Sequence, residues 1–221
     1  LIRPLRTRIE QMAPVNRALR IGRLPTLPAR VLRHLDDRGL LGDHIIVAGT
    51  NALFAYESAA GALIGGDMLA TGDADLLWDS RRFLELAGNS LPREGLLGLL
   101  RSIDATFEAH YGYNATNSEG YIVDLITPDD ENLPTKLGDA ADLEATPMEG
   151  AKWLLDAPRF EQVIVAADGI PLRIIAPEPR TFALHKLWLS GRDSRQALKK
   201  PRDAAQAKLV TEADAMTLAL A

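Results

Sequence analysis

The stretch TGDADLLWD, residues 71–79, places Asp73 and Asp75 one residue apart inside an otherwise apolar run. Side chains of a β-strand alternate between its two faces, so carboxylates at i and i+2 project from one face, about 7 Å apart along the chain. Desolvated like charges at that spacing repel one another unless a cation or a proton neutralises them. Such hard oxygen ligands suit Mg²⁺. The pair is therefore a candidate metal site.

A lone carboxylate lies in a second apolar run. Asp124 stands in YIVDLIT, residues 121–127. An unpaired Asp in a buried strand is costly, so it needs a cation, a hydrogen-bond network or an exposed strand end. The alternative is an edge-strand Asp that faces water. The sequence holds four acid-x-acid pairs, roughly the number that chance predicts, and only the pair at 73 and 75 lies in an apolar strand context.

A glycine junction precedes both acidic runs. HIIVAG, residues 44–49, predicts a buried strand, and the GTN sequence at 49–51 leads from it into a predicted helix in which Thr50 or Asn51 is available as N-cap. The free N–H groups and positive dipole of a helix N-terminus suit phosphate. Such a junction is common in α/β packing, so alone it is a weak signal.

Apolar periodicity divides the remaining chain into helices and strands. We expect helices over 28–41, 50–64, 80–88, 92–103, 179–190, 201–210 and 211–220, and strands over 68–79, 105–110 and 120–127. The segment 160–177 predicts a hairpin that turns at Asp168-Gly169. The predicted class is α+β with a helical C-terminal region.

Charge is unevenly distributed along the 221 residues. Residues 1–38 hold nine arginines and three acidic residues, a net charge of +6, which leaves −11 for the rest of a chain whose total is −5. Residues 1–26 are interpreted as a basic N-terminal arm or irregular cap, which either contacts nucleic acid or pairs with the carboxylates of the body.

Several protein classes are excluded by composition. The absence of cysteine excludes disulfides, zinc–thiolate sites and thiol nucleophiles, and no apolar stretch approaches the roughly 20 residues of a membrane span. We therefore expect a cytoplasmic protein with no membrane contact. The first residues lack an initiator Met and a signal-peptide core, so the chain is interpreted as a fragment or a trimmed product.

In this order the motifs resemble those of the nucleotidyltransferase-fold superfamily, which has the fold of DNA polymerase beta. The pattern is a hydrophobic strand, Gly-Thr, a helix, T-x-D-x-D-hydrophobic, and a third strand with a single Asp. The long interval from Gly49 to Asp73 and the preceding Thr71 look more like bacterial stand-alone members, including abortive-infection-type nucleotidyltransferases. TFALHKLWLSGR (181–192) and KKPRDAAQA (199–207) also resemble that branch. Thr50 departs from the commoner Gly or Ser.

The resemblance implies a mixed β-sheet flanked by helices. It implies a catalytic core over 27–145, followed by the hairpin and C-terminal helical region over 146–221. Asp73 and Asp75 would hold one or two Mg²⁺ (or Mn²⁺) ions, and Asp124 would complete the site nearest the acceptor hydroxyl, where it could act as base.

The same resemblance implies the substrate contacts. Gly49 and Thr50 would cradle the β- and γ-phosphates of an NTP, with the Thr50 or Asn51 side chain assisting, and Lys186 would pair with the triphosphate. A nucleoside monophosphate would pass to an acceptor hydroxyl of RNA, protein or a small molecule, with release of pyrophosphate. The basic arm, residues 1–26, would support tRNA or another RNA as acceptor.

Two other interpretations of the sequence remain open. One is a catalytically inactive nucleotidyltransferase-fold module that binds nucleic acid or a partner protein. The other is an Asp-x-Asp glycosyltransferase, which is disfavoured because a single predicted strand precedes Asp73. Six further residues are given structural roles: His185 in packing or at the surface, Trp78, Trp153 and Trp188 in the core or an interface, and Arg202 and Asp203 in bracing the C-terminal helices.

Overall fold

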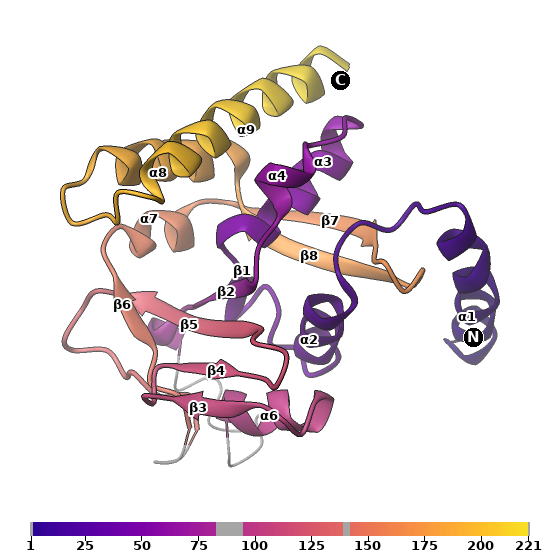
Figure 1. The fold of residues 1–221 in the computed structure, drawn as a ribbon, viewed down its shortest axis with the longest axis horizontal. Helices are drawn as coiled ribbons and strands as arrows, with labels where there is room; N and C mark the ends of the chain where they lie inside the picture. Colours follow the sequence, from indigo (N-terminus) through magenta and orange to yellow (C-terminus); the bar gives the residue numbers. More distant parts are fainter. Residues whose placement is uncertain (1, 83–94, 139–141, 221) are drawn as a thin grey trace.

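The computed structural model describes residues 2–82, 95–138 and 142–220 (Figure 1). Its main helices are α1 (Ile2–Ala18), α2 (Thr26–Asp37), α3 (Leu53–Ala60), α6 (Gly95–Ile103), α8 (Pro179–Gly191) and α9 (Lys200–Leu220), with the shorter η1 (Gly49–Ala52), α4 (Gly66–Leu69), η2 (Ser80–Arg82) and α7 (Ala151–Asp156). The strands are β1 (Ile45–Val47), β2 (Asp73–Trp78), β3 (Glu108–His110), β4 (Asn114–Thr116), β5 (Ile122–Pro128), β6 (Thr146–Met148), β7 (Arg159–Val165) and β8 (Pro171–Pro177). The predicted α+β class with a helical C-terminal region is confirmed.

The central sheet is mixed, as the family resemblance implies. Its strands follow the order β1-β2-β5-β4-β3, and β6 pairs with the end of β5. The β2–β5 and β5–β6 pairs are parallel, whereas β1–β2, β5–β4 and β4–β3 are antiparallel. The two apolar runs that carry the candidate carboxylates are therefore adjacent parallel strands.

The two faces of this sheet differ in chemistry. Ala74 of β2 and Val123 of β5 point into the core and are almost fully buried. Because side chains alternate along a strand, Asp73, Asp75 and Asp124 point to the opposite face. The apolar positions anchor the register, since a slip of one residue would turn the carboxylates into the core.

The β7–β8 hairpin lies outside the main sheet and turns at the predicted position. Arg33 of α2 holds this turn with a bidentate contact to the Asp168 carboxylate, at 2.7 and 3.0 Å. One hydrophobic core cluster contains residues from Leu24 to Val210 and includes side chains of both the sheet and the hairpin. The division into a core over 27–145 and a C-terminal region over 146–221 stays a prediction.

Several element boundaries differ from the expected ones. The helix expected over 50–64 is η1 followed by α3, and the strand expected over 68–79 begins only at Asp73, after α4. The two helices expected over 201–220 form one helix, α9, because no breaker separates them. β4, β6 and α7 were not expected. Most of the helix expected over 80–88, and the start of the one over 92–103, lie outside the described residues.

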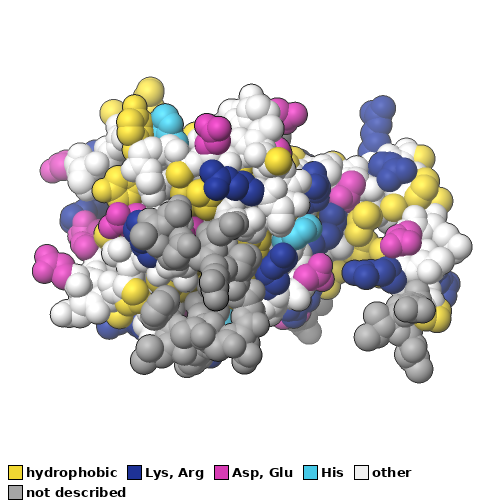
Figure 2. Space-filling model, turned by 90° about the horizontal axis from the view of Figure 1, so that it is seen from below, with side chains coloured by type: hydrophobic (Ala, Val, Ile, Leu, Met, Phe, Trp, Pro, Cys, Tyr) yellow, Lys and Arg dark blue, Asp and Glu magenta, His cyan; other side chains and the backbone are white. Residues whose placement is uncertain are grey.

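The N-terminal segment is a regular helix rather than an irregular cap. Pro4 lies in the first turn of α1, where its missing N–H has no partner to lose, and Pro14 lies close to the end of the helix. α1 projects from the body (Figure 1) and reaches it through the hairpin turn, where the Asn16 side-chain amide donates to the Gly169 carbonyl at 2.8 Å. Seen from below, this projecting end carries hydrophobic and basic side chains together (Figure 2).

Candidate active site

Three aspartates from two neighbouring strands form an acidic cluster on the face of the sheet opposite Ala74 and Val123. In the β2–β5 register Asp75 lies opposite Asp124, and Asp73 lies two residues before Asp75 on the same face. One carboxylate oxygen from each of the three lies within 4.8 Å of the others. The structure thus brings together the three residues that the sequence singled out. Three hard oxygen donors at this spacing fit one Mg²⁺ or Mn²⁺ ion.

The electrostatics of the cluster also favour a bound cation. Burial, and then the neighbouring carboxylate of Asp73, raise the pKa of Asp75 to about 6. Burial and Asp73 likewise raise the pKa of Asp124, while hydrogen bonding by Asn114 and the charge of Lys199 act in the opposite direction. A divalent ion would neutralise this repulsion and hold the carboxylates ionised at neutral pH.

Gly49 lies directly against the acidic cluster. Its φ is +57°, a conformation that L side chains rarely adopt, and a Cβ atom built there would lie 1.7 Å from Oδ2 of Asp75. The space that a side chain at position 49 would need is therefore occupied by the Asp75 carboxylate. Glycine at this position leaves space for the Asp75 carboxylate.

The prediction that Thr50 or Asn51 is a helix N-cap is wrong, because both lie inside the 3₁₀ turn η1 and neither η1 nor α3 has a side-chain cap. Asn51 is buried, and its Nδ2 donates to the backbone carbonyl of Asp73 at 3.1 Å. Thr50 borders the pocket above the cluster, and its hydroxyl oxygen lies 3.3 Å from Nε2 of Gln206. Asn51 thus braces the acidic strand, and Thr50 joins the turn to α9.

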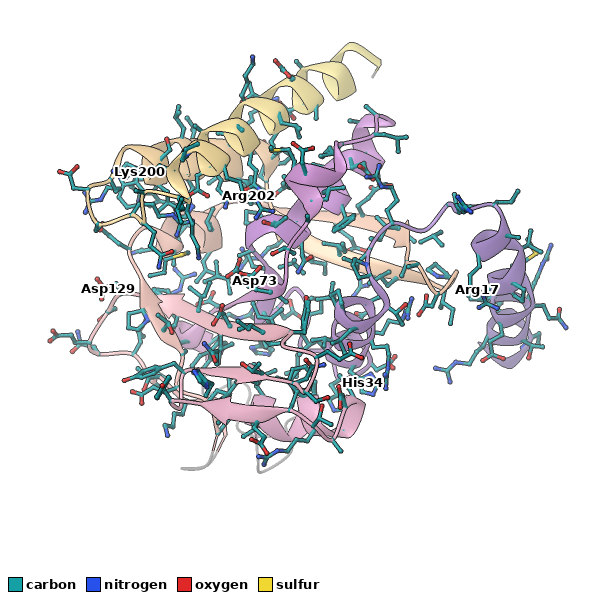
Figure 3. All side chains as sticks on the ribbon, in the orientation of Figure 1. Arg17, His34, Asp73, Asp129, Lys200 and Arg202 are labelled. Atoms are coloured by element: carbon teal, nitrogen blue, oxygen red, sulfur yellow. The ribbon has the colours of Figure 1, made fainter. Side chains whose placement is uncertain are left out.

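A pocket separates the acidic face of the sheet from the C-terminal helices. Gly49, Thr50, Asp73 and Asp75 line one side of it. The other side carries four cationic side chains, Lys186, Arg195, Lys199 and Arg202. Figure 3 shows Asp73 on the sheet and Arg202 above it on the α9 side. A pocket with carboxylates on one wall and cations on the other suits a polyphosphate that carries a divalent ion.

Lys186 is buried and points into this pocket, with an ionic partner of its own. Its Nζ lies 2.8 Å from Oδ1 of Asp203, whose second oxygen accepts from Nε of Arg195 at 2.6 Å. The side chain of Asp203 is 3% exposed. Both cations lower the pKa of the Asp203 carboxyl, although its burial acts in the opposite direction. Asp203 therefore braces the C-terminal helices, as expected, and orients two cations of the pocket.

Three of these cations had no predicted role in the site. Arg195 and Lys199 lie between α8 and the start of α9, in a polar segment without apolar periodicity. Arg202 bonds through its guanidinium to the backbone carbonyls of Met68 and Ala70, and so ties α9 to the segment before β2. The motif KKPRD at 199–203 was a signal for this wall, because it concentrates basic residues in an otherwise acidic body.

His185 is a buried residue at the edge of the pocket. Burial, and then the charge of Lys186, lower the pKa of its imidazole to about 4. Its ring contacts Trp153 and Trp188, with centroids 6.3 and 5.8 Å away. The packing role expected for His185 is thus observed, and Trp153 is half exposed beside it.

The fold and the acidic cluster together define a protein of the nucleotidyltransferase-fold superfamily. A family model described as nucleotidyltransferase matches residues 27–221, and the chain belongs to this family. No curated protein and no solved structure gives a significant match. The match does not identify the branch of the superfamily, so the relation to abortive-infection-type members stays a prediction. None of the described helices combines the length and apolarity that crossing a membrane requires.

Proposed function

We propose that the protein is a divalent-metal-dependent nucleotidyltransferase that transfers a nucleoside monophosphate from an NTP to an acceptor hydroxyl. The observation that carries the proposal is the cluster of Asp73, Asp75 and Asp124, two members of which, Asp73 and Asp75, line a pocket opposite its cationic wall. Family membership supports a transferase of this class and favours nucleotidyl transfer over sugar transfer.

In the proposed reaction the acceptor oxygen attacks the α-phosphorus, the bond to the β-phosphate oxygen breaks, and pyrophosphate leaves. Asp73, Asp75 and Asp124 would hold the divalent ion, Mg²⁺ or Mn²⁺. The ion would supply Lewis-acid stabilisation of the attacking and leaving oxygens. Asp124, on the side of the cluster away from Gly49, would receive the proton of the acceptor hydroxyl.

The remaining pocket residues would bind the triphosphate. Backbone N–H groups of Gly49 and Thr50 would contact its terminal phosphates, while Asn51 holds the backbone of β2 in place. Lys186 and Arg195 would exchange part of their contact with Asp203 for phosphate oxygens. These cations would also stabilise the charge that accumulates on pyrophosphate as it leaves.

The direct test is transfer of label from α-³²P-NTP into cell extract components in the presence of Mg²⁺. The wild-type protein should label an acceptor and release pyrophosphate, and EDTA should stop both. Asp75→Asn, which keeps the size of the side chain but removes its charge, should lower the rate by at least about a thousandfold, because it disrupts metal binding and positioning. Labelling by the wild-type protein no greater than in extract alone would contradict the proposal and leave the inactive binding module as the better account, and equal labelling by wild type and Asp75→Asn would contradict the role of Asp75.

A further inference from the structure

The acidic cluster continues as a row of polar side chains across the sheet. Asp75 pairs with Asp124, Asp124 with Asn114 of β4, and Asn114 with His110 of β3. Residues directly opposite one another on adjacent strands point to the same face. The row therefore leads from the proposed metal ligands to His110, two strand spacings, or about 10 Å, beyond Asp124.

Asn114 links this row to the proposed chemistry. Its side chain is hydrogen bonded to Asp124, an interaction that lowers the pKa of that carboxyl. Its Oδ1 is buried and has no hydrogen-bond partner among the residues that the structure describes. A buried amide oxygen without a partner is costly, and a ligand hydroxyl can satisfy it.

The turn that ends the row presents aromatic rings to solvent. Tyr111 is 85% exposed and Tyr113 is 50% exposed. The Tyr111 ring packs edge-on against His110, with centroids 4.2 Å apart. The turn is also fixed in place, because the Gly112 carbonyl accepts from the Glu144 backbone N–H at 2.7 Å.

Tyr111 adopts a backbone conformation that is costly for an aromatic residue. Its φ is +51°, in the left-handed region where glycine and asparagine are favoured. Burial of the Tyr111 ring cannot offset this strain, because most of the ring is exposed to water. Strain of this kind is concentrated at binding and catalytic sites.

We infer that the β3–β4 turn binds the terminal nucleoside of the acceptor, with the base stacked on the exposed Tyr111 ring and the sugar hydroxyl at Asp124 and Asn114. This inference rests on the proposed nucleotidyl transfer and gives its acceptor a chemical class. The acceptor enters along the row from the β3 side, opposite the NTP pocket. A base on an aromatic ring is held through its π-face, so binding tolerates different sequences.

The β3–β4 turn and the basic arm differ in charge, so binding at one can be distinguished from binding at the other. Residues 108–116 contain no Lys or Arg, so binding there involves few phosphate contacts. In Figure 3 Arg17 of α1 lies far from Asp73, on the projecting end of the molecule. Binding through the turn should therefore depend weakly on salt, whereas binding through the arginines of α1 should depend steeply on it.

The test measures binding of a 5′-fluorescent ten-nucleotide RNA with a free 3′ hydroxyl, by anisotropy with Mg²⁺ and without NTP. Tyr111→Asn removes the ring and keeps a residue that tolerates positive φ, and it should weaken binding about tenfold. Tyr111→Phe keeps the ring and should bind within about twofold of wild type. Adenosine as competitor distinguishes a free nucleoside from a polynucleotide end as the acceptor. Thermal unfolding establishes that both variants fold.

Equal binding by wild type and Tyr111→Asn, or no binding of either RNA or adenosine by wild type, would overturn the inference. So would a steep salt dependence that disappears in an Arg6→Ala, Arg8→Ala variant, because the arm would then be the binding surface. The proposed function is separable from these outcomes. Label transfer to a protein or a small molecule with an acceptor KM unchanged by Tyr111→Asn would refute the nucleoside acceptor and leave nucleotidyl transfer standing.

Discussion

Gly49 and Asp75 lie so close together that a Cβ atom added at position 49 would overlap the Asp75 carboxylate. The Cβ of any other residue at position 49 would lie 1.7 Å from the Asp75 carboxylate oxygen. The glycine that begins the turn and the central metal-ligand candidate are therefore constrained together, although 26 positions separate them in the chain.

This contact predicts the effect of Gly49→Ala. The substitution should cost about 1–2 kcal/mol for the left-handed backbone, and it should also displace the Asp75 carboxylate. Gly61 is a matched control, because its φ is +61° and no atom lies within 4 Å of an added Cβ. Gly61→Ala should lose similar stability in urea unfolding and keep Mg²⁺-dependent transfer, whereas Gly49→Ala should lose transfer as well. Equal activity of the two variants would show that the contact with Asp75 is unimportant.

Metal binding should depend on pH through Asp75. Its pKa of about 6 means that the carboxyl of the metal-free protein is largely protonated at pH 5 and ionised at pH 7. Because an ion must displace that proton, the rise in Tm caused by Mg²⁺ should be larger at pH 7 than at pH 5. Differential scanning calorimetry with Mg²⁺ and with EDTA measures this difference. Asp75→Asn should show little Mg²⁺-induced shift at either pH, and a full shift in this variant would contradict the assignment.

The Lys186–Asp203 pair allows stability to be separated from substrate binding. Lys186→Met leaves the buried Asp203 carboxylate with Arg195 as partner, and should lower the free energy of unfolding by about 1–3 kcal/mol. Adding Asp203→Asn removes the excess buried charge, so the double variant should recover most of that stability. Both variants should bind NTP at least about tenfold more weakly than wild type. Wild-type NTP affinity in the double variant would exclude Lys186 as a phosphate ligand.

His185 should make the protein less stable in mild acid. Its pKa is about 4 in the folded protein and near 6.5 in an unfolded chain, so the unfolded state binds the extra proton first. This residue's contribution is fully present above pH 6.5 and is lost as pH falls toward 4, by at most about 3 kcal/mol. Urea unfolding of wild type and His185→Gln at pH 7 and pH 5 isolates the contribution of His185 to the free energy of unfolding. A loss on acidification that is equal in both proteins would assign the effect to other groups.

Strong local patterns predicted the acidic site. Asp73, Asp75 and Asp124 stand in runs whose other members must be buried, so alternation places the carboxylates on the opposite face. The family resemblance then joined the two runs, because strand pairing is not encoded within either one. Lys186 was placed by the same resemblance, and its burial beside Asp203 could not be foreseen from an amphipathic helix pattern.

The missed features are short or depend on distant contacts. β4 has three residues inside a polar loop, and it becomes a strand only because β3 and β5 flank it. Thr50 and Asn51 resemble helix caps locally, but Gln206 and the Asp73 carbonyl provide their partners from elsewhere in the chain. The row that ends at His110 depends on β4, so the acceptor surface inferred here could not be seen before the register was known.

The pairing of Asp75 with Asp124 also has a kinetic consequence. The two residues are about fifty positions apart, and parallel strands meet only after a long crossover has closed. We expect the complete set of three ligands to assemble late on the folding route, after the antiparallel neighbours β3, β4 and β5 have joined. Mg²⁺ should then slow unfolding far more than it speeds refolding, since little of the ion's binding free energy is available at the barrier.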